Sequence, residues 1–217
     1  FIKTSFKSGP LSGKKITITA GPTREQIDPV RFISNNSSGK MGYALADAAI
    51  EAGAFVNLVS GPVSIKANKH ANLIKVNSGK EMLDKVVKSM NDSDIFIGCA
   101  AVSDFRPSDY SDIKIKKEGM KNIDIHLERN EDILSYVASE YPAAFVVGFA
   151  ADTADVNSNA KKKLKSKNLN MIISNDVSDK SIGFDVDDNE VNVITNKETI
   201  FLKKDKKIRI AREIFKI

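Results

Sequence analysis

Residues 21–42 read GPTREQIDPVRFISNNSSGKMG and form the long connection around which the chain is organised. They follow a short apolar run, ITIT at residues 16–19, and lead into LADAAIEAGA, whose small apolar residues suit a helix. This order predicts a strand, a glycine-bounded loop and a helix. A connection of about twenty residues is unusual in a compact domain. Open α/β sheets bind ligands at the carboxyl ends of their parallel strands, so we expect this loop to contribute to a binding site.

The loop is rich in groups that bind anions. It contains the basic side chains Arg24, Arg31 and Lys40, and the amide and hydroxyl run Asn35, Asn36, Ser37 and Ser38 precedes Lys40. Gly39 and Gly42 flank the expected helix start. Donors beside a helix N-terminus form a natural site for phosphate or carboxylate. The alternative interpretation is a solvated basic loop with an ordinary helix cap, because a short glycine motif is by itself a weak signal.

Composition restricts the class of protein. The 217 residues fit one domain, and 41% hydrophobic with 28% charged residues is typical of a soluble globular protein. No apolar run approaches the roughly 18 residues of a membrane helix, and no secretory signal is present. The single cysteine, Cys99, excludes an internal disulfide framework and a cysteine-rich metal site. We therefore expect a cytoplasmic protein with no membrane partner.

The net charge is +5, from 33 basic and 28 acidic residues. Such a charge suits nucleic acid, but it equally suits anionic small substrates or a lysine-rich genome. The absence of tryptophan and the 7% aromatic content leave little surface on which single-stranded bases could stack. We therefore favour small anionic substrates and expect no nucleic-acid partner.

The remaining pattern predicts a doubly wound α/β domain with a mostly parallel, Rossmann-like sheet. The expected strands are residues 16–19, 55–59, 73–76, 95–101, 145–149 and 171–174. The expected helices are residues 43–52, a helix behind a capping box at 78–81, a helix capped by Asn130, residues 155–167, and residues 206–217 with Ile208, Ala211 and Phe215 inward.

Two antiparallel hairpins are expected in addition to this sheet. Residues 123–127 alternate between apolar and polar and should pair with the segment around Ile113, while residues 190–194 should pair with residues 199–202. Residues 1–13 are polar and lack periodicity. They predict a linker or an expression remnant, followed by one domain at residues 14–217.

The long loop closely resembles the signature of a known family. The pattern GPTRE-x-IDPVRFISN-x-SSGKMG is similar to that of phosphopantothenoylcysteine synthetase, the ligase of the coenzyme A pathway. GCAAVSDFRP, followed by DIKIKKEG, is similar to the family's GCAAV-x-D-[YF]-R and KIKK. Five blocks match in order, from about residue 14 to the C-terminus. The resemblance implies a homodimer and, as in many bacteria, fusion to an N-terminal flavin-dependent decarboxylase.

The resemblance implies a nucleotide site for CTP. Asp104 would help to bind the triphosphate and the divalent cation, Mg²⁺ or Mn²⁺, and Lys114 would contact the nucleotide and act in catalysis. The segment at residues 130–133 resembles an N-P-D-I motif with Glu131 in place of proline, and Phe149 in GFAADT would line the base pocket. The full implied nucleotide set is Ser37, Ser38, Gly39, Lys40, Gly98, Ala100, Asp104, Lys114, Asn130, Glu131, Asp132, Ile133, Phe149, Lys163 and Lys167.

The same resemblance implies a substrate site. Asn35 matches the asparagine that processes the acyl-nucleotide intermediate, and Arg31, with Ala100 and Ala101, would bind 4′-phosphopantothenate. The alternative for Arg31 is a structural salt bridge, and the alternative for the lysines at residues 161–167 is a solvated helix face. The implied reaction activates the phosphopantothenate carboxylate as an acyl cytidylate, which the amine of L-cysteine then attacks. The choice of CTP over ATP follows the bacterial form of the family and is not decided by the physics of the sequence.

Other candidate residues are better explained without catalysis. Cys99 lies within an apolar run, which favours a buried thiol over a nucleophile. His126 falls on the polar side of its alternating segment, which predicts a surface position. The sequence offers no obvious Ser–His–acid arrangement, and the implied reaction requires no nucleophile from the enzyme.

Three rival functions fit parts of the sequence. A P-loop ATPase would need G-x-x-x-x-G-K-[ST], but Met41 follows Gly39-Lys40 and Ser34 stands at the position of the first glycine. A nicotinamide-dependent oxidoreductase would share the fold, but no G-x-G-x-x-G opens the first helix and no acidic residue ends the second strand. A nucleic-acid-binding domain without enzymatic activity is the remaining alternative, and salt-dependent DNA retention would support it.

Overall fold

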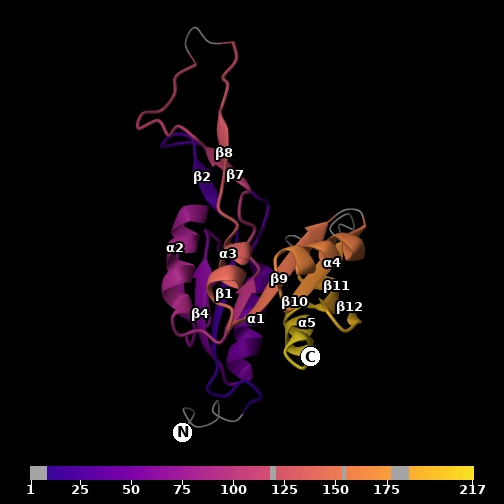
Figure 1. Ribbon diagram of the computed structural model, residues 1–217. Coiled ribbons are helices and arrows are strands. Elements are labelled where there is room, and N and C mark those ends of the chain that lie inside the picture. The colour runs from indigo at the N-terminus through magenta and orange to yellow at the C-terminus, as the bar shows by residue number, and fades with distance from the viewer. Residues whose placement is uncertain (1–8, 118–120, 153–154, 177–185) are drawn as a thin grey trace.

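The computed structural model describes residues 9–117, 121–152, 155–176 and 186–217. An eight-stranded sheet forms its centre (Figure 1). Its parallel strands, in spatial order, are β5 (Asn72–Lys75), β4 (Phe55–Ser60), β1 (Lys15–Ala20), β6 (Ile95–Gly98), β9 (Phe145–Asp152) and β10 (Met171–Asp176). The antiparallel strands β11 (Asp188–Thr195) and β12 (Thr199–Lys206) extend the sheet beyond β10.

Counted along the chain, the parallel strands have the order 3-2-1-4-5-6, which is that of dinucleotide-binding folds. The predicted doubly wound, Rossmann-like fold is therefore confirmed. The predicted hairpin of residues 190–194 with residues 199–202 is confirmed as β11 and β12, although both strands are longer than expected.

Helices cover both faces of the sheet. On one face pack α1 (Lys40–Glu51) and α5 (Lys207–Ile214), and on the other α2 (Gly79–Met90), α3 (Ile133–Glu140) and α4 (Val156–Ser166). Ile16 and Ile18 of β1 belong to the core on the α1 side, and Phe96 of β6 belongs to the core on the α2 side. Central strands are thus buried on both faces, which explains their continuous apolar runs. Among the described helices, none has both the length and the apolar character needed to cross a membrane.

The sequence predicted that the first helix begins at residue 43. In the structure, helix α1 begins earlier, at Lys40. Gly39 precedes it with a φ of 79°, a left-handed conformation that favours glycine. A Cβ on Gly42 would lie 2.6 Å from the Cβ of Ala20, so glycine lets the first turn of α1 approach β1 closely. The low helix propensity of glycine hid this turn from the sequence pattern.

Two other predicted details differ from the structure, and one is confirmed. Asp132 caps α3 instead of Asn130, because its Oδ1 accepts the amide of Ser135 at 3.0 Å. The inward face of α5 is formed by Ile210, Ala211 and Ile214, while Ile208 and Phe215 are only partly buried. The capping box of α2 is confirmed, since Ser78 Oγ accepts the Glu81 amide at 3.2 Å.

Strand β6 ends at Gly98 and not at residue 101 as predicted. The amides of Cys99 and Ala100 leave the ladder and donate to Thr19 Oγ1, at 3.1 and 3.2 Å. Ala101 then forms an isolated bridge with Pro22. The loops that follow β1 and β6 are therefore joined at the carboxyl edge of the sheet.

A second structural unit, here called the arm, comprises the described residues 24–34, 105–117 and 121–129 and projects from this edge (Figure 1). It contains two short antiparallel pairs: β2 (Arg24–Gln26) with β3 (Phe32–Ser34), and β7 (Phe105–Pro107) with β8 (Leu127–Arg129). The predicted pairing of the Ile113 region with residues 123–127 is wrong, because the described residues between β7 and β8 form no strand. Ile123 and Ile125 remain 47% and 40% exposed, so their alternation reflects an apolar face that this chain leaves open.

Most of the predicted linker, residues 1–8, lies outside the described residues. In its remainder, the amide of Leu11 donates to the carbonyl of Ala52 at 3.0 Å, which ties this segment to the end of α1.

Candidate functional site

Two adjoining cavities lie at the carboxyl edge of the sheet. The first has a volume of about 630 Å³ and lies among β6, β9 and the N-terminus of α3. The second, of about 320 Å³, lies at the N-termini of α1 and α5. The residues that line both are Ala100, Val102, Asp104 and Phe149. This is the position expected for ligands in the fold, because chain crossovers on either side of β1 and β6 run to opposite faces of the sheet.

The first cavity brings together nine residues predicted to bind nucleotide. They are Gly98, Ala100, Asp104, Asn130, Glu131, Asp132, Ile133, Phe149 and Lys167. They come from the end of β6 and the loop after it, from the interior of β9, from the turn at the start of α3 and from the end of α4. Their proximity is a property of the fold, and their role in binding stays a prediction.

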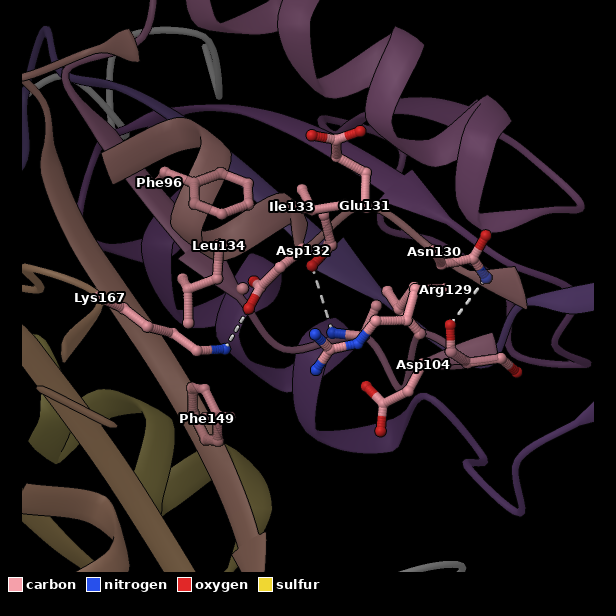
Figure 2. Close-up of a pocket in the computed structure, with 15 residues that line it drawn as sticks. Phe96, Asp104, Arg129, Asn130, Glu131, Asp132, Ile133, Leu134, Phe149 and Lys167 are labelled. Carbon is pink, nitrogen blue, oxygen red and sulfur yellow. Dashed lines mark hydrogen bonds and ion pairs between the residues drawn. The ribbon is translucent and has the colours of Figure 1, made fainter. Parts of the chain in front are cut away.

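An ion pair lies inside this cavity. Lys167 Nζ is 2.6 Å from Asp132 Oδ2, and Figure 2 shows Lys167 extending to Asp132 with Phe149 nearby. Burial favours a higher pKa for Asp132, but the hydrogen bonds from Lys167 and from the Ser135 amide outweigh it and hold the pKa below the ordinary value. Asp132 is therefore charged at neutral pH and fixes the ammonium of Lys167 at the cavity.

Asn130 holds the turn before α3 against the loop after β6. Its Nδ2 donates to the Ser103 carbonyl at 2.8 Å, and its Oδ1 accepts from Arg106 Nη1 at 2.9 Å.

Sequence reasoning missed Ser103 and Arg129 as lining residues. Ser103 adjoins Asp104 in the same block, and its buried Oγ has no hydrogen-bond partner within the described ranges.

The second cavity brings together the predicted residues of the first loop. Ser37, Ser38, Gly39 and Lys40 line it with Ala100, Ala101 and Lys163. No side chain caps the N-terminus of α1, and Lys40 Nζ pairs with Asp187 Oδ1 at 2.9 Å. Sequence reasoning missed Asn175, Asn189 and Lys207, which also line this cavity. Asn175 carried a signal, since it ends an expected strand, whereas Lys207 carried none beyond its charge.

The predicted residues Asn35, Arg31 and Lys114 line neither cavity. Asn35 lies beside the second, because its Nδ2 donates to the carbonyl of Ala101 at 3.0 Å. Arg31 and Lys114 lie on the arm. Arg31 pairs with Asp28 and donates to the Ile115 carbonyl at 3.0 Å, which is the structural salt bridge considered as its alternative.

The carboxyl of Asp28 is buried in the turn between β2 and β3, within the arm. The hydrogen bonds from Arg31 hold the pKa of Asp28 far below its ordinary range, against the effect of burial, and the amides of Val30 and Ile115 act in the same direction. The Val30 amide donates to Asp28 Oδ1 at 2.8 Å and the Ile115 amide to Oδ2 at 3.1 Å. Asp28 therefore ties the two parts of the arm together.

The metal-ligating side chains near the two cavities suit a metal ion that binds together with a nucleotide better than one that the protein binds alone. Across the described part of the chain, no three His, Cys, Asp or Glu side chains gather to hold an ion. Mg²⁺ commonly binds through one or two carboxylates and the phosphates of its substrate. Asp104 supplies one exposed carboxylate between the two cavities, as this mode requires.

The structure places two residues for which the sequence favoured no catalytic role: Cys99 is partly exposed, where a buried thiol was expected, and His126 lies on the surface, as expected. Cys99 lies in the wall of the second cavity, and burial raises the pKa of its thiol to about 12, so the thiolate is scarce at neutral pH. His126 is exposed on the arm.

Comparison with known proteins agrees with this arrangement. The family model described as DNA/pantothenate metabolism flavoprotein C-terminal domain matches residues 11–217. The coenzyme A biosynthesis bifunctional protein CoaBC of Vibrio vulnificus (strain CMCP6) is 46% identical over 213 residues, which are 97% of this chain and 53% of that protein. CoaBC of Bacillus subtilis (strain 168) is 47% identical over 197 residues, 90% of this chain and 47% of that protein.

Among solved structures, the C-terminal domain of a CoaBC protein superposes with a TM-score of 0.82 at 42% identity. The match covers 96% of this chain and 95% of that domain. The chain therefore spans about half the length of the curated relatives that it matches, and nearly all of the C-terminal domain solved on its own.

Proposed function

Because the chain belongs to the family of DNA/pantothenate metabolism flavoprotein C-terminal domains, we propose that it is a phosphopantothenate–cysteine ligase of coenzyme A biosynthesis. It would join 4′-phosphopantothenate and L-cysteine while CTP is cleaved to CMP and pyrophosphate. The observation that carries the proposal is the convergence of the expected nucleotide residues on two cavities that share Asp104 and Phe149.

In the first step, a carboxylate oxygen of 4′-phosphopantothenate attacks the α-phosphorus of CTP. The bond between that phosphorus and the bridging oxygen breaks, and pyrophosphate leaves with the electron pair. Lys40, Lys163 and the N-terminus of α1 would offset the charge that develops on the leaving group. Asp104 would hold Mg²⁺, which when bound supplies further positive charge beside the triphosphate.

In the second step, the amine of cysteine attacks the acyl carbon of the cytidylate. The bond from that carbon to the phosphate oxygen breaks, CMP leaves, and the new amide nitrogen loses its proton. Asn35, beside Ala101, would donate to the oxyanion of the tetrahedral intermediate, where one such donor can be worth about 3 kcal/mol.

The proposal extends to partners. We propose a homodimer formed through the arm, whose apolar residues are exposed in the single chain. Lys114 and Arg31 lie on the arm, so pairing of two chains offers them a route to a neighbouring site. We further propose fusion to an N-terminal flavin-dependent decarboxylase, because the matched relatives are bifunctional and about twice as long. CTP as nucleotide, Mg²⁺ or Mn²⁺ as cation, and a cytoplasmic location remain predictions.

The decisive experiment is pyrophosphate release with 4′-phosphopantothenate, Mg²⁺ and either CTP or ATP, with and without cysteine. The expected result is release with CTP, and CMP formation that cysteine completes. Asn35→Asp should release pyrophosphate and accumulate the acyl cytidylate, because the variant loses a donor needed only in the second step.

The outcomes separate the parts of the proposal. Release with ATP alone would retain the ligase and overturn the choice of CTP. No release with either nucleotide, from folded and dimeric protein, would overturn the ligase.

A further inference from the structure

Helix α5 begins with a largely buried lysine. Lys207 is only 6% exposed and lines the second cavity together with Lys40 and Lys163. A buried ammonium is costly unless it is compensated, and a cation at a helix N-terminus opposes the helix dipole. The adjacent residue, Lys206, has a side chain that is 58% exposed and pairs with Asp188 at 2.8 Å. Of the two lysines, only Lys207 lines the cavity.

The packing of α5 explains this placement. Helices α1 and α5 lie against each other in one core, and Arg212 near the end of α5 pairs with Glu51 at the end of α1, with Nε 2.7 Å from Oε2. Their other ends, Lys207 and Lys40, line the same cavity. The two helices therefore run in the same direction, and both positive helix ends face the second cavity.

The surroundings of this cluster attract anions. Asp187 lies against it, with its Oδ1 2.9 Å from Lys40 Nζ. The hydrogen bond from Lys40 is the main reason that the pKa of Asp187 lies below its ordinary value, and the charges of Lys206 and Lys207 contribute. The carboxylate of Asp187 is 70% exposed, so a stronger anion can displace it without opening the core.

We propose that Lys207 is a phosphate-binding residue of the second cavity, acting with Lys40, Lys163 and the N-terminus of α1. This inference rests on the proposed ligase function and adds to it a residue outside the sequence signature. The shared chemistry is a phosphate group, and the β- and γ-phosphates of CTP fit best. Phe149 lines both cavities, and the larger one contains Phe96 in addition, which suits the base. Three lysines and one carboxylate line the smaller cavity, whereas the basic side chains of the larger one, Arg129 and Lys167, are outnumbered by carboxylates, so the phosphates are assigned to the smaller cavity.

Two variants separate binding from a structural role. Lys207 Nζ donates to the Val186 carbonyl, a contact that fixes the chain before β11. Lys207→Gln keeps a donor for this carbonyl and removes the charge, while Lys207→Met removes both. Lys206→Met is the matched control, because it removes an exposed charge one residue away.

The test is calorimetric binding of CTP, pyrophosphate and 4′-phosphopantothenate, each with Mg²⁺, together with the melting temperature of each variant. We expect both Lys207 variants to bind CTP and pyrophosphate at least tenfold more weakly, and Lys206→Met to change these affinities less than twofold. The melting temperature of Lys207→Gln should equal or exceed that of the wild type, because a buried charge is removed. If the Lys207 variants lost affinity only for 4′-phosphopantothenate, Lys207 would bind the phosphate of that substrate, and the assignment to CTP would be overturned.

The proposal would be overturned if folded Lys207→Gln bound all three ligands with unchanged affinity. It would also be overturned if Lys206→Met lost as much affinity as the Lys207 variants. A lower melting temperature in Lys207→Met, with wild-type binding in Lys207→Gln, would assign Lys207 a structural role instead. Failure of the ligase function has a different signature. The wild type would then form no product, whereas its pyrophosphate binding would still depend on Lys207.

Discussion

Lys167 Nζ and Asp132 Oδ2 lie 2.6 Å apart, and this ion pair joins the C-terminus of α4 to the N-terminus of α3 across the first cavity. Each charge occupies the helix end that its sign favours, since Asp132 caps α3 and Lys167 caps α4. The pair therefore holds two walls of the cavity at a fixed separation while leaving a cation at the site.

Replacement of Lys167 should affect ligand binding more than folding. We expect Lys167→Met to weaken CTP binding about tenfold, or about 1.4 kcal/mol. The free energy of unfolding should fall by less than about 1 kcal/mol, because both side chains are partly exposed. Calorimetric titration and denaturant unfolding measure the two effects. Lys165→Met, at an exposed position on the same helix, is the control and should change neither. A large loss of stability with unchanged CTP affinity would contradict this assignment.

Asp28 should make the stability of the arm depend on pH. Its pKa is lowered in the folded chain, so its contribution is present above the unfolded value of about 3.9 and is lost as pH falls through the folded value. We expect Asp28→Asn to melt at a lower temperature than the wild type at pH 7, and the difference to shrink progressively below pH 4. Melting curves between pH 2.5 and 7 measure it. A difference that is constant with pH would show that the charge of Asp28 is not the cause.

The open apolar face of the arm should mediate self-association. Ile125 is 40% exposed there, and Ile125→Asp would place a charge in the proposed interface. We expect the dimer dissociation constant to rise at least tenfold, measured by sedimentation equilibrium. The control is Phe55→Asp, because Phe55 is 66% exposed at the start of β4, at the opposite edge of the sheet. Equal dissociation in both variants, or in neither, would exclude the arm as the interface.

The contact of α1 with β1 should tolerate no side chain at residue 42. A Cβ there would lie 2.6 Å from the Cβ of Ala20 and 3.2 Å from the carbonyl of Thr19. We expect Gly42→Ala to destabilise the chain by about 1–3 kcal/mol despite the higher helix propensity of alanine. Because the displaced turn forms the second cavity, phosphate binding should weaken as well. Urea unfolding and pyrophosphate titration measure these effects, and a stabilised variant would contradict the close packing.

The sequence predicted the centre of the sheet because its central strands are buried on both faces and form continuous apolar runs. It also predicted that Asp104, Phe149 and Lys167 would meet, since they follow strand ends or match a signature of the family. Their meeting is confirmed by the first cavity, while their chemical roles await experiment.

The details that sequence reasoning missed depend on partners far away along the chain. Ile125 shows by alternation that it belongs to an apolar face, but alternation does not say what covers that face. Arg31 contacts Ile115, and neither residue carries a local sign of the other. In the sequence, Lys207 looks like any other lysine of a helix. Its burial arises only when α5 packs on α1.

Asp104 and Phe149 belong to the walls of both cavities, and this has a thermodynamic consequence. An occupant of one cavity changes the surface that the other presents, so the two binding equilibria are linked. Linkage is reciprocal: if one ligand raises the affinity for a second by some factor, the second raises the affinity for the first by the same factor. Titrations of each substrate in the presence of the other would give this coupling free energy. It is a property of the two cavities with their shared wall, and neither ligand measured alone reveals it.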